Sequence, residues 1–197
     1  GVVEAMDLIG STQVQGRATL VGNLCNGSPA ADSVPALIAA GASVTIISPN
    51  GSRDVSVEDI PHSPGKTTLK KGELISAINL PNQKTNGGDA YLRLIPRTEM
   101  DIAVVGCGVN LSVKEGIVSH ARVSLGAVTA KVILVKEAAD AIIGTSLDDE
   151  ALTALSFAAS AACKPINDKR GTIEYRTHVA GVLAKRAAQI AYKRARY

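Results

Sequence analysis

The sequence predicts an α+β fold made of two halves. The first half contains a short helical run and β-rich runs, and the second half contains β-rich runs followed by three helical patterns. In the second half the strands come before the helices, which is the order typical of an antiparallel sheet with helices packed against it. The polar residues 82–89, which include two glycines, predict a linker or a hairpin turn between the halves.

The first half is predicted to hold one helix and three strands. Ser28 is expected as N-cap and Pro29 as first residue of a helix over 29–40, which Pro35 interrupts. Asn50 and Gly51 are a hairpin signal between the first two strands. The predicted strands cover residues 43–48, 52–57 and 73–80.

The strand over 73–80 alternates between two faces. The face predicted to be core consists of Leu74, Ser76, Ile78 and Leu80. The other face consists of Ile75, Ala77 and Asn79. From the residues alone, this second face suits a half-exposed sheet surface and contact with a flat ring system equally well.

The second half is predicted to form an antiparallel sheet and then helices. Its strands are expected at residues 91–96, 102–113 and 117–125, with a turn at 114–116. Its helices are expected at residues 131–143, 148–162 and 172–195. The acidic residues at 148–150 favour a helix start because they complement its dipole. The apolar stripe predicted for the last helix consists of Tyr175, Val179, Leu183 and Ile190.

Composition is that of a globular protein with few aromatic residues. The 197 residues are 46% hydrophobic, 20% charged and 3% aromatic, so the core must consist of Ala, Val, Leu and Ile. The net charge is +3, and basic residues gather in the last thirteen positions. A solvated helix end is the favoured interpretation of that tail, contact with an acidic partner subunit is the alternative, and nucleic-acid binding is not expected.

Cysteine and histidine usage argues against a metal or cluster site on this chain. Cys25, Cys107 and Cys163 are too far apart for a disulfide scaffold or an iron–sulfur ligand run, which predicts a reducing, cytoplasmic location. Cys25 is expected to be a buried small hydrophobe. The three histidines have no ligand spacing, and no catalytic group or membrane span is predicted.

Residues 19–32 join glycines, short polar side chains and a predicted helix start. Gly22 and Gly27 can adopt positive φ and allow close approach of a ligand to the backbone. Such loops are usually plain turns, and neither a Rossmann nor a Walker pattern is present. Composition alone therefore does not identify a cofactor site.

Four stretches in the same order resemble the FAD-binding medium subunits of the xanthine dehydrogenase and carbon monoxide dehydrogenase (molybdenum hydroxylase) family. The longest, from Ile9 to Ala42, is similar to the flavin-binding segment of these subunits. The others are GELISAINLP at 72–81, AYLRLIPRTEMDIAVVG at 90–106 and DKRGTIEYR at 168–176. The positions that depart from the family pattern are Gln15, Gly16, Ala18 and Val21. Because Val21 replaces the first glycine of a pair, we expect a turn that is either restricted to one conformation or of different shape there.

The resemblance implies two domains. Residues 1–84 would form the second subdomain of a two-subdomain FAD-binding fold of the vanillyl-alcohol oxidase (PCMH-like) type, and residues 88–197 the C-terminal domain of carbon monoxide dehydrogenase flavoproteins. Family members usually carry a preceding N-terminal subdomain whose glycine-rich loop wraps the FAD pyrophosphate. We therefore expect either that this sequence is part of a subunit or that another chain supplies that subdomain.

The resemblance also implies which residues bind FAD. They are Thr19, Leu20, Val21, Gly22, Asn23, Asp32, Ile75 and Arg93. Thr19, Gly22 and Asn23 would meet the phosphates and ribityl chain, and Asp32 a polar part of the cofactor. Ile75 would contact the face of the flavin ring, and Arg93 would contact the ring edge or the phosphates. Without the resemblance, the residues alone favour the interpretation of Arg93 as a surface arginine in a strand. A brace that seats the final helix is expected from Asp168, Arg170, Tyr175 and Arg176.

The function implied is electron transfer. Electrons from two-iron two-sulfur clusters on a small subunit would pass through FAD on this chain to an external acceptor, and a large subunit with the molybdenum cofactor would oxidise the substrate. The alternative is a cofactor-free module that only bridges the other subunits. The altered glycine pair at Val21 and Gly22 favours this alternative.

Overall fold

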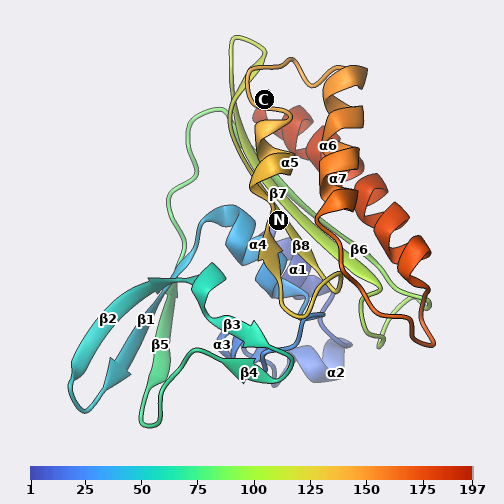
Figure 1. The fold of residues 1–197 in the computed structure, drawn as a ribbon. Coiled ribbons are helices and arrows are strands. Elements are labelled where there is room, and N and C mark those ends of the chain that lie inside the picture. The colour runs from blue at the N-terminus through green and yellow to red at the C-terminus, as the bar shows by residue number, and fades with distance from the viewer. Residues whose placement is uncertain (197) are drawn as a thin grey trace.

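The computed structural model describes residues 1–196 and confirms the α+β fold (Figure 1). The elements of the first half are α1 (Val2–Asp7), α2 (Thr12–Gln15), α3 (Leu20–Cys25), α4 (Ser33–Ala40), β1 (Ser43–Ser48), β2 (Gly51–Ser56), the 3₁₀ helix η1 (Val57–Asp59), β3 (Pro61–Ser63), β4 (Lys66–Thr67) and β5 (Leu74–Asn79). Those of the second half are β6 (Gly87–Leu94), β7 (Val105–Lys114), β8 (Ile117–Gly126), β9 (Ile133–Leu134), α5 (Lys136–Asp140), α6 (Asp149–Ala161) and α7 (Ile173–Ala195).

The first half contains a three-stranded antiparallel sheet in the order β2-β1-β5 and a small β3-β4 hairpin. The predicted strands and the first hairpin are confirmed. Ser48 pairs with Gly51, which leaves Pro49 and Asn50 as the two central residues of the turn. Gly51 has φ 120°, a conformation that favours glycine.

Strand β5 contains a bulge at Ser76, which has no partner on β1 in the register. An extra residue reverses the alternation of side chains beyond it, so Ile75 and Ile78 both reach the apolar core of the first half. The prediction that Leu74 and Leu80 face the core is therefore wrong, since they are 54% and 51% exposed.

Helix α4 begins later than predicted. The Ser28 hydroxyl accepts a hydrogen bond from the Ala30 N–H at 3.2 Å and closes a turn, whereas the helix starts at Ser33. Pro35 lies in the first turn of α4, where a missing N–H leaves no intrahelical bond unmade. Proline therefore marks the start of this helix and does not interrupt it.

Helix α4 lies between the cores of the two halves, and every residue from Ser33 to Ala39 is buried. One side packs into the apolar cluster around β1 and β5. The other side lies on β7 and β8, where Gly108 leaves room: a Cβ there would come within 2.6 Å of the Pro35 carbonyl oxygen. A helix that is apolar all round is typical of such a fully buried position.

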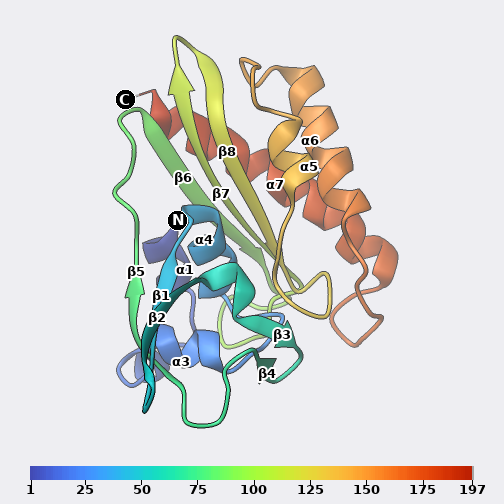
Figure 2. The same ribbon diagram turned by 60° about the vertical axis from the view of Figure 1, so that its left-hand side comes forward.

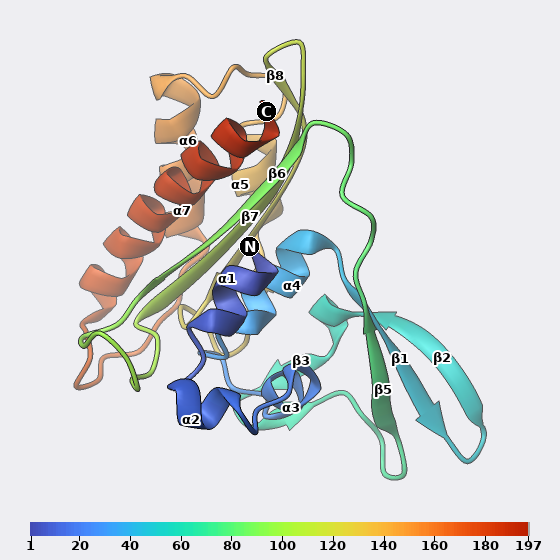
Figure 3. The same ribbon diagram turned by 180° about the vertical axis from the view of Figure 1, so that it is seen from behind.

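The second half contains a four-stranded antiparallel sheet in the order β6-β7-β8-β9. Glu115 and Gly116 form the predicted turn between β7 and β8. Strand β6 starts at Gly87, inside the predicted linker, so the connection is shorter than expected. Helices α5, α6 and α7 gather on one face of this sheet (Figure 2), and α1 and α4 lie on the other (Figure 3).

Alanines bring α7 close to the sheet. Its buried stripe consists mainly of Ala180, Ala184, Ala187, Ala188 and Ala191. A Cβ at Gly88 of β6 would come within 2.1 Å of the Ala191 carbonyl oxygen, so the helix and strand backbones are nearly in contact. Val179 and Leu183 are buried as predicted, but Tyr175, one position off this stripe, is 47% exposed.

Helices α6 and α7 confirm the predictions at 148–162 and 172–195, and the Asp148 carboxylate caps α6. The prediction of one helix over 131–143 is too long. Ile133 and Leu134 pair with β8 as strand β9, and the helix that follows covers only 136–140. Among residues 1–196, no helix combines the length and apolar character needed to cross a membrane.

Candidate functional site

Helix α3 begins at the centre of the predicted site. Thr19 is its N-cap, and the Thr19 hydroxyl accepts a hydrogen bond from the Gly22 N–H at 2.9 Å. Gly22 is helical and does not use the positive φ that glycine allows, whereas Gly27 does have φ 63°. A Cβ at Gly22 would come within 2.8 Å of the Thr19 hydroxyl oxygen, which explains the glycine by space and not by φ.

Val21 is the second residue of α3 and packs against the apolar cluster of the first half. A helical residue needs no positive φ, so the β-branched side chain causes no strain here. The backbone at Val21 forms the first turn of a helix in this chain, and the expectation that its shape differs from that of other family members stays a prediction.

The start of α3 offers unpaired donors. Within residues 1–196, the backbone N–H groups of Leu20 and Val21 have no hydrogen-bond acceptor. Thr19 and Gly22 are exposed, and a hollow of about 150 Å³ is lined by Thr19, Leu20 and Gln15 among others. First-turn N–H groups of a helix require such an external acceptor or water.

Asn23 connects α3 to the start of α4. Its side-chain oxygen accepts hydrogen bonds from the Ser33 N–H at 3.3 Å and the Ser33 hydroxyl at 2.6 Å. Ser33 is fully buried, so this contact fixes the orientation of the amide. The Asn23 side-chain NH₂ then points away from Ser33 and has no acceptor within residues 1–196.

Asp32 holds a buried arginine. The Asp32 carboxylate accepts a hydrogen bond from the Arg93 guanidinium at 2.9 Å and a longer one from the Tyr91 hydroxyl at 3.4 Å. The Arg93 side chain is only 4% exposed, so the prediction from the residues alone of a surface arginine is wrong. Burial raises the pKa of Asp32 although Arg93 opposes this shift, and burial together with Asp32 raises the pKa of Tyr91 well above its usual range.

Ile75 is 7% exposed and lies in the same apolar cluster as Leu20, Val21 and Leu24. Ile75 therefore packs against α3 within this chain. Its predicted contact with a flavin ring stays a prediction.

The eight predicted residues form one connected region around α3 and the start of α4. Ser33 donates hydrogen bonds to Asn23, and Arg93 donates one to Asp32, the residue before Ser33. Sequence reasoning missed Ser33 and Tyr91. Tyr91 lies two residues before Arg93 in β6, so the strand period places both side chains on one face, and this signal could have identified it.

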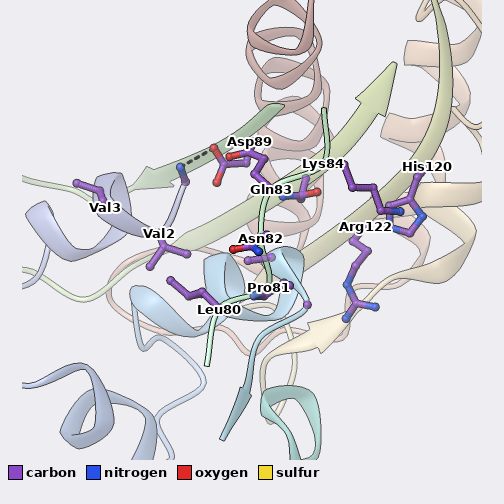
Figure 4. A pocket seen from close by; sticks show the side chains of 14 residues that line it. Val2, Val3, Leu80, Pro81, Asn82, Gln83, Lys84, Asp89, His120 and Arg122 are labelled. Carbon is purple, nitrogen blue, oxygen red and sulfur yellow. Dashed lines mark ion pairs between the residues drawn. The ribbon is translucent and has the colours of Figure 1, made fainter. Parts of the chain in front are cut away.

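A separate cleft of about 460 Å³ lies between the linker, α4 and the second sheet (Figure 4). Lys84, His120 and Arg122 line it, and burial, Lys84 and Arg122 in that order lower the pKa of His120. Arg122 is tied to the Ile38 carbonyl at 3.0 Å and to Glu58 at 2.7 Å. None of the eight predicted residues lines this cleft.

The predicted brace of α7 is confirmed for Asp168 and Arg176. Arg176 is buried, pairs with Asp168 at 2.6 Å and donates to the Val104 carbonyl at 2.8 Å. Arg170 pairs with Asp101 at 3.0 Å, while Tyr175 is exposed and takes no part.

Cys25 is exposed, so the prediction that it is buried is wrong. Cys107 is buried, and burial raises the pKa of its thiol to about 12. Within residues 1–196, no group of histidine, cysteine and acidic side chains could hold a metal ion.

Comparison with known families identifies both parts of the chain. Residues 1–83 match the model described as "FAD binding domain in molybdopterin dehydrogenase", and residues 90–191 match "CO dehydrogenase flavoprotein C-terminal domain". The carbon monoxide dehydrogenase medium chain of Afipia carboxidovorans is 34% identical over 189 residues, and a putative xanthine dehydrogenase FAD-binding subunit of Escherichia coli is 29% identical over 179. These alignments cover 96% and 90% of this chain, which spans 65% and 61% of the length of those relatives.

Solved structures agree with the sequence comparison. Carbon monoxide dehydrogenase of Hydrogenophaga pseudoflava superposes with a TM-score of 0.93 at 34% identity, over 97% of this chain and 66% of that one. Quinoline 2-oxidoreductase of Pseudomonas putida superposes with a TM-score of 0.90 at 25% identity, over 98% of this chain and 67% of that one. The chain therefore belongs to the family of FAD-binding medium subunits of the carbon monoxide dehydrogenase and xanthine dehydrogenase type, with an FAD-binding domain followed by the flavoprotein C-terminal domain.

Proposed function

We propose that this chain carries FAD in a molybdenum hydroxylase and transfers electrons from iron–sulfur clusters on a small subunit to an external acceptor. Substrate oxidation then takes place on a large subunit that holds the molybdenum cofactor. The observation that carries this proposal is that the segment matching the FAD-binding family contains, at the start of α3, a group of hydrogen-bond donors that have no acceptor among residues 1–196.

The donors around α3 fit a phosphate-bearing cofactor. The N–H groups of Leu20 and Val21 and the side-chain NH₂ of Asn23 are unpaired within residues 1–196, and none of them carries negative charge. Gly22 is exposed in the first turn of α3 and carries no side chain there. A set made only of donors suits the oxygen atoms of a pyrophosphate and the hydroxyl groups of a ribityl chain.

Each predicted residue has a distinct task in this proposal. Thr19 fixes the first turn of α3, and Ser33 orients the Asn23 amide toward the cofactor. Asp32 holds Arg93 in place so that this cation can approach a ring edge or phosphate, and Ile75 supplies an apolar surface. Bound FAD would accept a pair of electrons and release them to a second acceptor.

The domain division and the partners complete the proposal. We assign residues 1–84 to the second FAD subdomain and residues 88–197 to the C-terminal domain. A preceding subdomain, on this chain or on a separate one, supplies the remaining contacts to the pyrophosphate. Cys25, Cys107 and Cys163 are free thiols, which supports a reducing, cytoplasmic location.

The visible spectrum of the purified assembly, and of residues 1–197 alone, tests the flavin. Protein-bound oxidised flavin absorbs near ~370 and ~450 nm, and released chromophore identifies FAD by its mass. We expect stoichiometric FAD in the assembly. An assembly with its partner subunits but no flavin would overturn the proposal and leave the cofactor-free bridging module.

A further inference from the structure

Strand β6 is an edge strand of the four-stranded sheet, and half of its outer edge is already capped. The Tyr91 N–H donates to the Glu4 carboxylate at 3.0 Å, and the Asp89 carbonyl accepts from Arg194 at 2.6 Å. Helices α1 and α7 therefore close the first part of the edge against other strands.

The second part of the edge is open. Backbone groups of alternate residues in a strand point to the same side, so Arg93 points outward like Asp89 and Tyr91. Within residues 1–196, the Tyr91 carbonyl and both the N–H and the carbonyl of Arg93 have no hydrogen-bond partner outside the sheet. An unpaired edge of this kind is a template for one more strand.

A groove of about 550 Å³ runs between this open edge and α7. Leu92 and Leu94 of β6 face Leu183 and Ile190 of α7 across it. Arg186 and Lys193, both exposed, lie on the same stripe of α7 because their spacing from Ile190 is four and three residues. Among the residues that the structure describes, no acidic side chain lines the groove.

We propose that the open half of β6 binds an extended acidic segment of a partner protein chain, which adds to the sheet as a further strand. Backbone hydrogen bonds to Tyr91 and Arg93 would set its register, apolar side chains would cover Leu92 and Leu94, and acidic side chains would meet Arg186 and Lys193. A second copy of this chain does not fit, because a two-fold contact would bring the same cations together. The groove shares only Arg93 with the predicted FAD site: its backbone borders the groove, while its guanidinium pairs with Asp32. The inference does not use that guanidinium and does not depend on FAD binding.

A labelled peptide tests strand addition. Residues 1–197 are titrated into a fluorescein-labelled peptide of about eight residues, and anisotropy reports binding. Every second residue of the peptide is threonine, and the residues between are alternately valine and glutamate, so that one face of the strand presents both kinds of side chain. A peptide with lysine in place of glutamate is the charge control. Two further peptides are N-methylated at alternate amides, one at the odd-numbered residues and the other at the even-numbered residues. Each peptide therefore loses the N–H donors along one of its two edges and keeps those along the other.

Charge reversal in the groove tests the location. We expect Arg186→Glu with Lys193→Glu to weaken peptide binding at least about tenfold. Lys131→Glu with Lys169→Glu, which makes the same change of charge at exposed positions outside the groove, should leave binding unchanged. We also expect only one of the two N-methylated peptides to bind.

The competing interpretation is a plain basic patch that discourages edge-to-edge pairing. Equal binding of both N-methylated peptides would overturn strand addition, since a patch of charge does not distinguish backbone frames. If the variant with Arg186→Glu and Lys193→Glu bound the peptide as tightly as the variant with Lys131→Glu and Lys169→Glu, the peptide would bind outside the groove. That result would also overturn the proposal. Thermal unfolding of each variant confirms that it is folded. The loss or retention of FAD bears on neither result.

Discussion

The Arg93 guanidinium donates to the Asp32 carboxylate at 2.9 Å, and this ion pair joins the start of α4 to the edge strand of the second sheet. Both side chains are largely shielded from water. Burial raises the pKa of Asp32 in spite of the neighbouring cation, so desolvation outweighs the attraction in this pair. A pair of this kind is a weak source of stability, which indicates a role in positioning.

Removing only one partner of this pair should destabilise the fold. We expect Asp32→Ala to lower the free energy of unfolding by about 3 kcal/mol, because Arg93 would be left as a buried charge without its acid. Asp32→Leu with Arg93→Leu should restore most of that loss and still fail to retain FAD. Urea unfolding and flavin content measure the two effects. A double variant as unstable as the single one would contradict this account.

Gly22→Ala separates flavin binding from stability. The new methyl group would displace the Thr19 hydroxyl, at a cost of about 1 kcal/mol for the lost cap, while alanine gains about 1 kcal/mol in helix propensity. We therefore expect the free energy of unfolding to change little and FAD content to fall. Thr19→Ser, which keeps the hydroxyl, should retain both. Full FAD content in Gly22→Ala would refute a role for this surface of α3.

The Glu4 carboxylate should make stability depend on pH in the acid range. Its hydrogen bond with Arg194, ahead of the Tyr91 N–H and nearby positive charge, lowers the pKa of Glu4 from 4.5 to about 2. A lowered pKa stabilises the folded state above the unfolded value, and that contribution is lost as pH falls from about 4.5 to about 2. Thermal unfolding of Glu4→Gln should decline less steeply than wild type over this range. Parallel declines would contradict the assignment.

Gly88→Ala should be severely destabilising. A Cβ at this position would lie 2.1 Å from the Ala191 carbonyl oxygen, so α7 must move off the sheet. We expect a loss of about 3 kcal/mol in urea unfolding. Gly16→Ala, whose Cβ would make only ordinary contacts at 3.7 Å, is the matched control and should be close to neutral.

The three cysteines should react in order of exposure. Alkylation of the native protein with iodoacetamide should modify Cys25 first, since it is the exposed thiol. Cys107, with its pKa raised by burial to about 12, should react only after unfolding. Peptide mass spectrometry with Cys25→Ser as control reports the order, and early modification of Cys107 would show that the second core opens readily.

Local sequence signals predicted most strands and two of the three C-terminal helices. Asn50-Gly51 and Glu115-Gly116 are short-range features that favour hairpins, and hairpins form at both places, although the central residues of the first turn are Pro49 and Asn50. The bulge at Ser76 was missed because it depends on pairing with β1, and a period-two pattern does not reveal a residue without a partner.

The candidate site was found through resemblance, and its local conformation was predicted less well. Gly22 was interpreted through φ, whereas the structure explains it through the space needed by the Thr19 hydroxyl. The burial of Arg93 depends on Asp32, which is 61 residues away, so no local pattern reports it. Tyr91, in contrast, follows from the strand period once Arg93 is assigned to β6.

The burial of α4 between both halves has a consequence for how the chain unfolds. The two family matches meet near residues 83–90, but a cut there would divide the sequence and not the hydrophobic interior. Residues 88–197 produced alone would expose the apolar surface of β7 and β8 to water, and residues 1–84 produced alone would expose the side of α4 that packs on this surface. The halves are therefore thermodynamically coupled, and a substitution in α4 changes the stability of both at once.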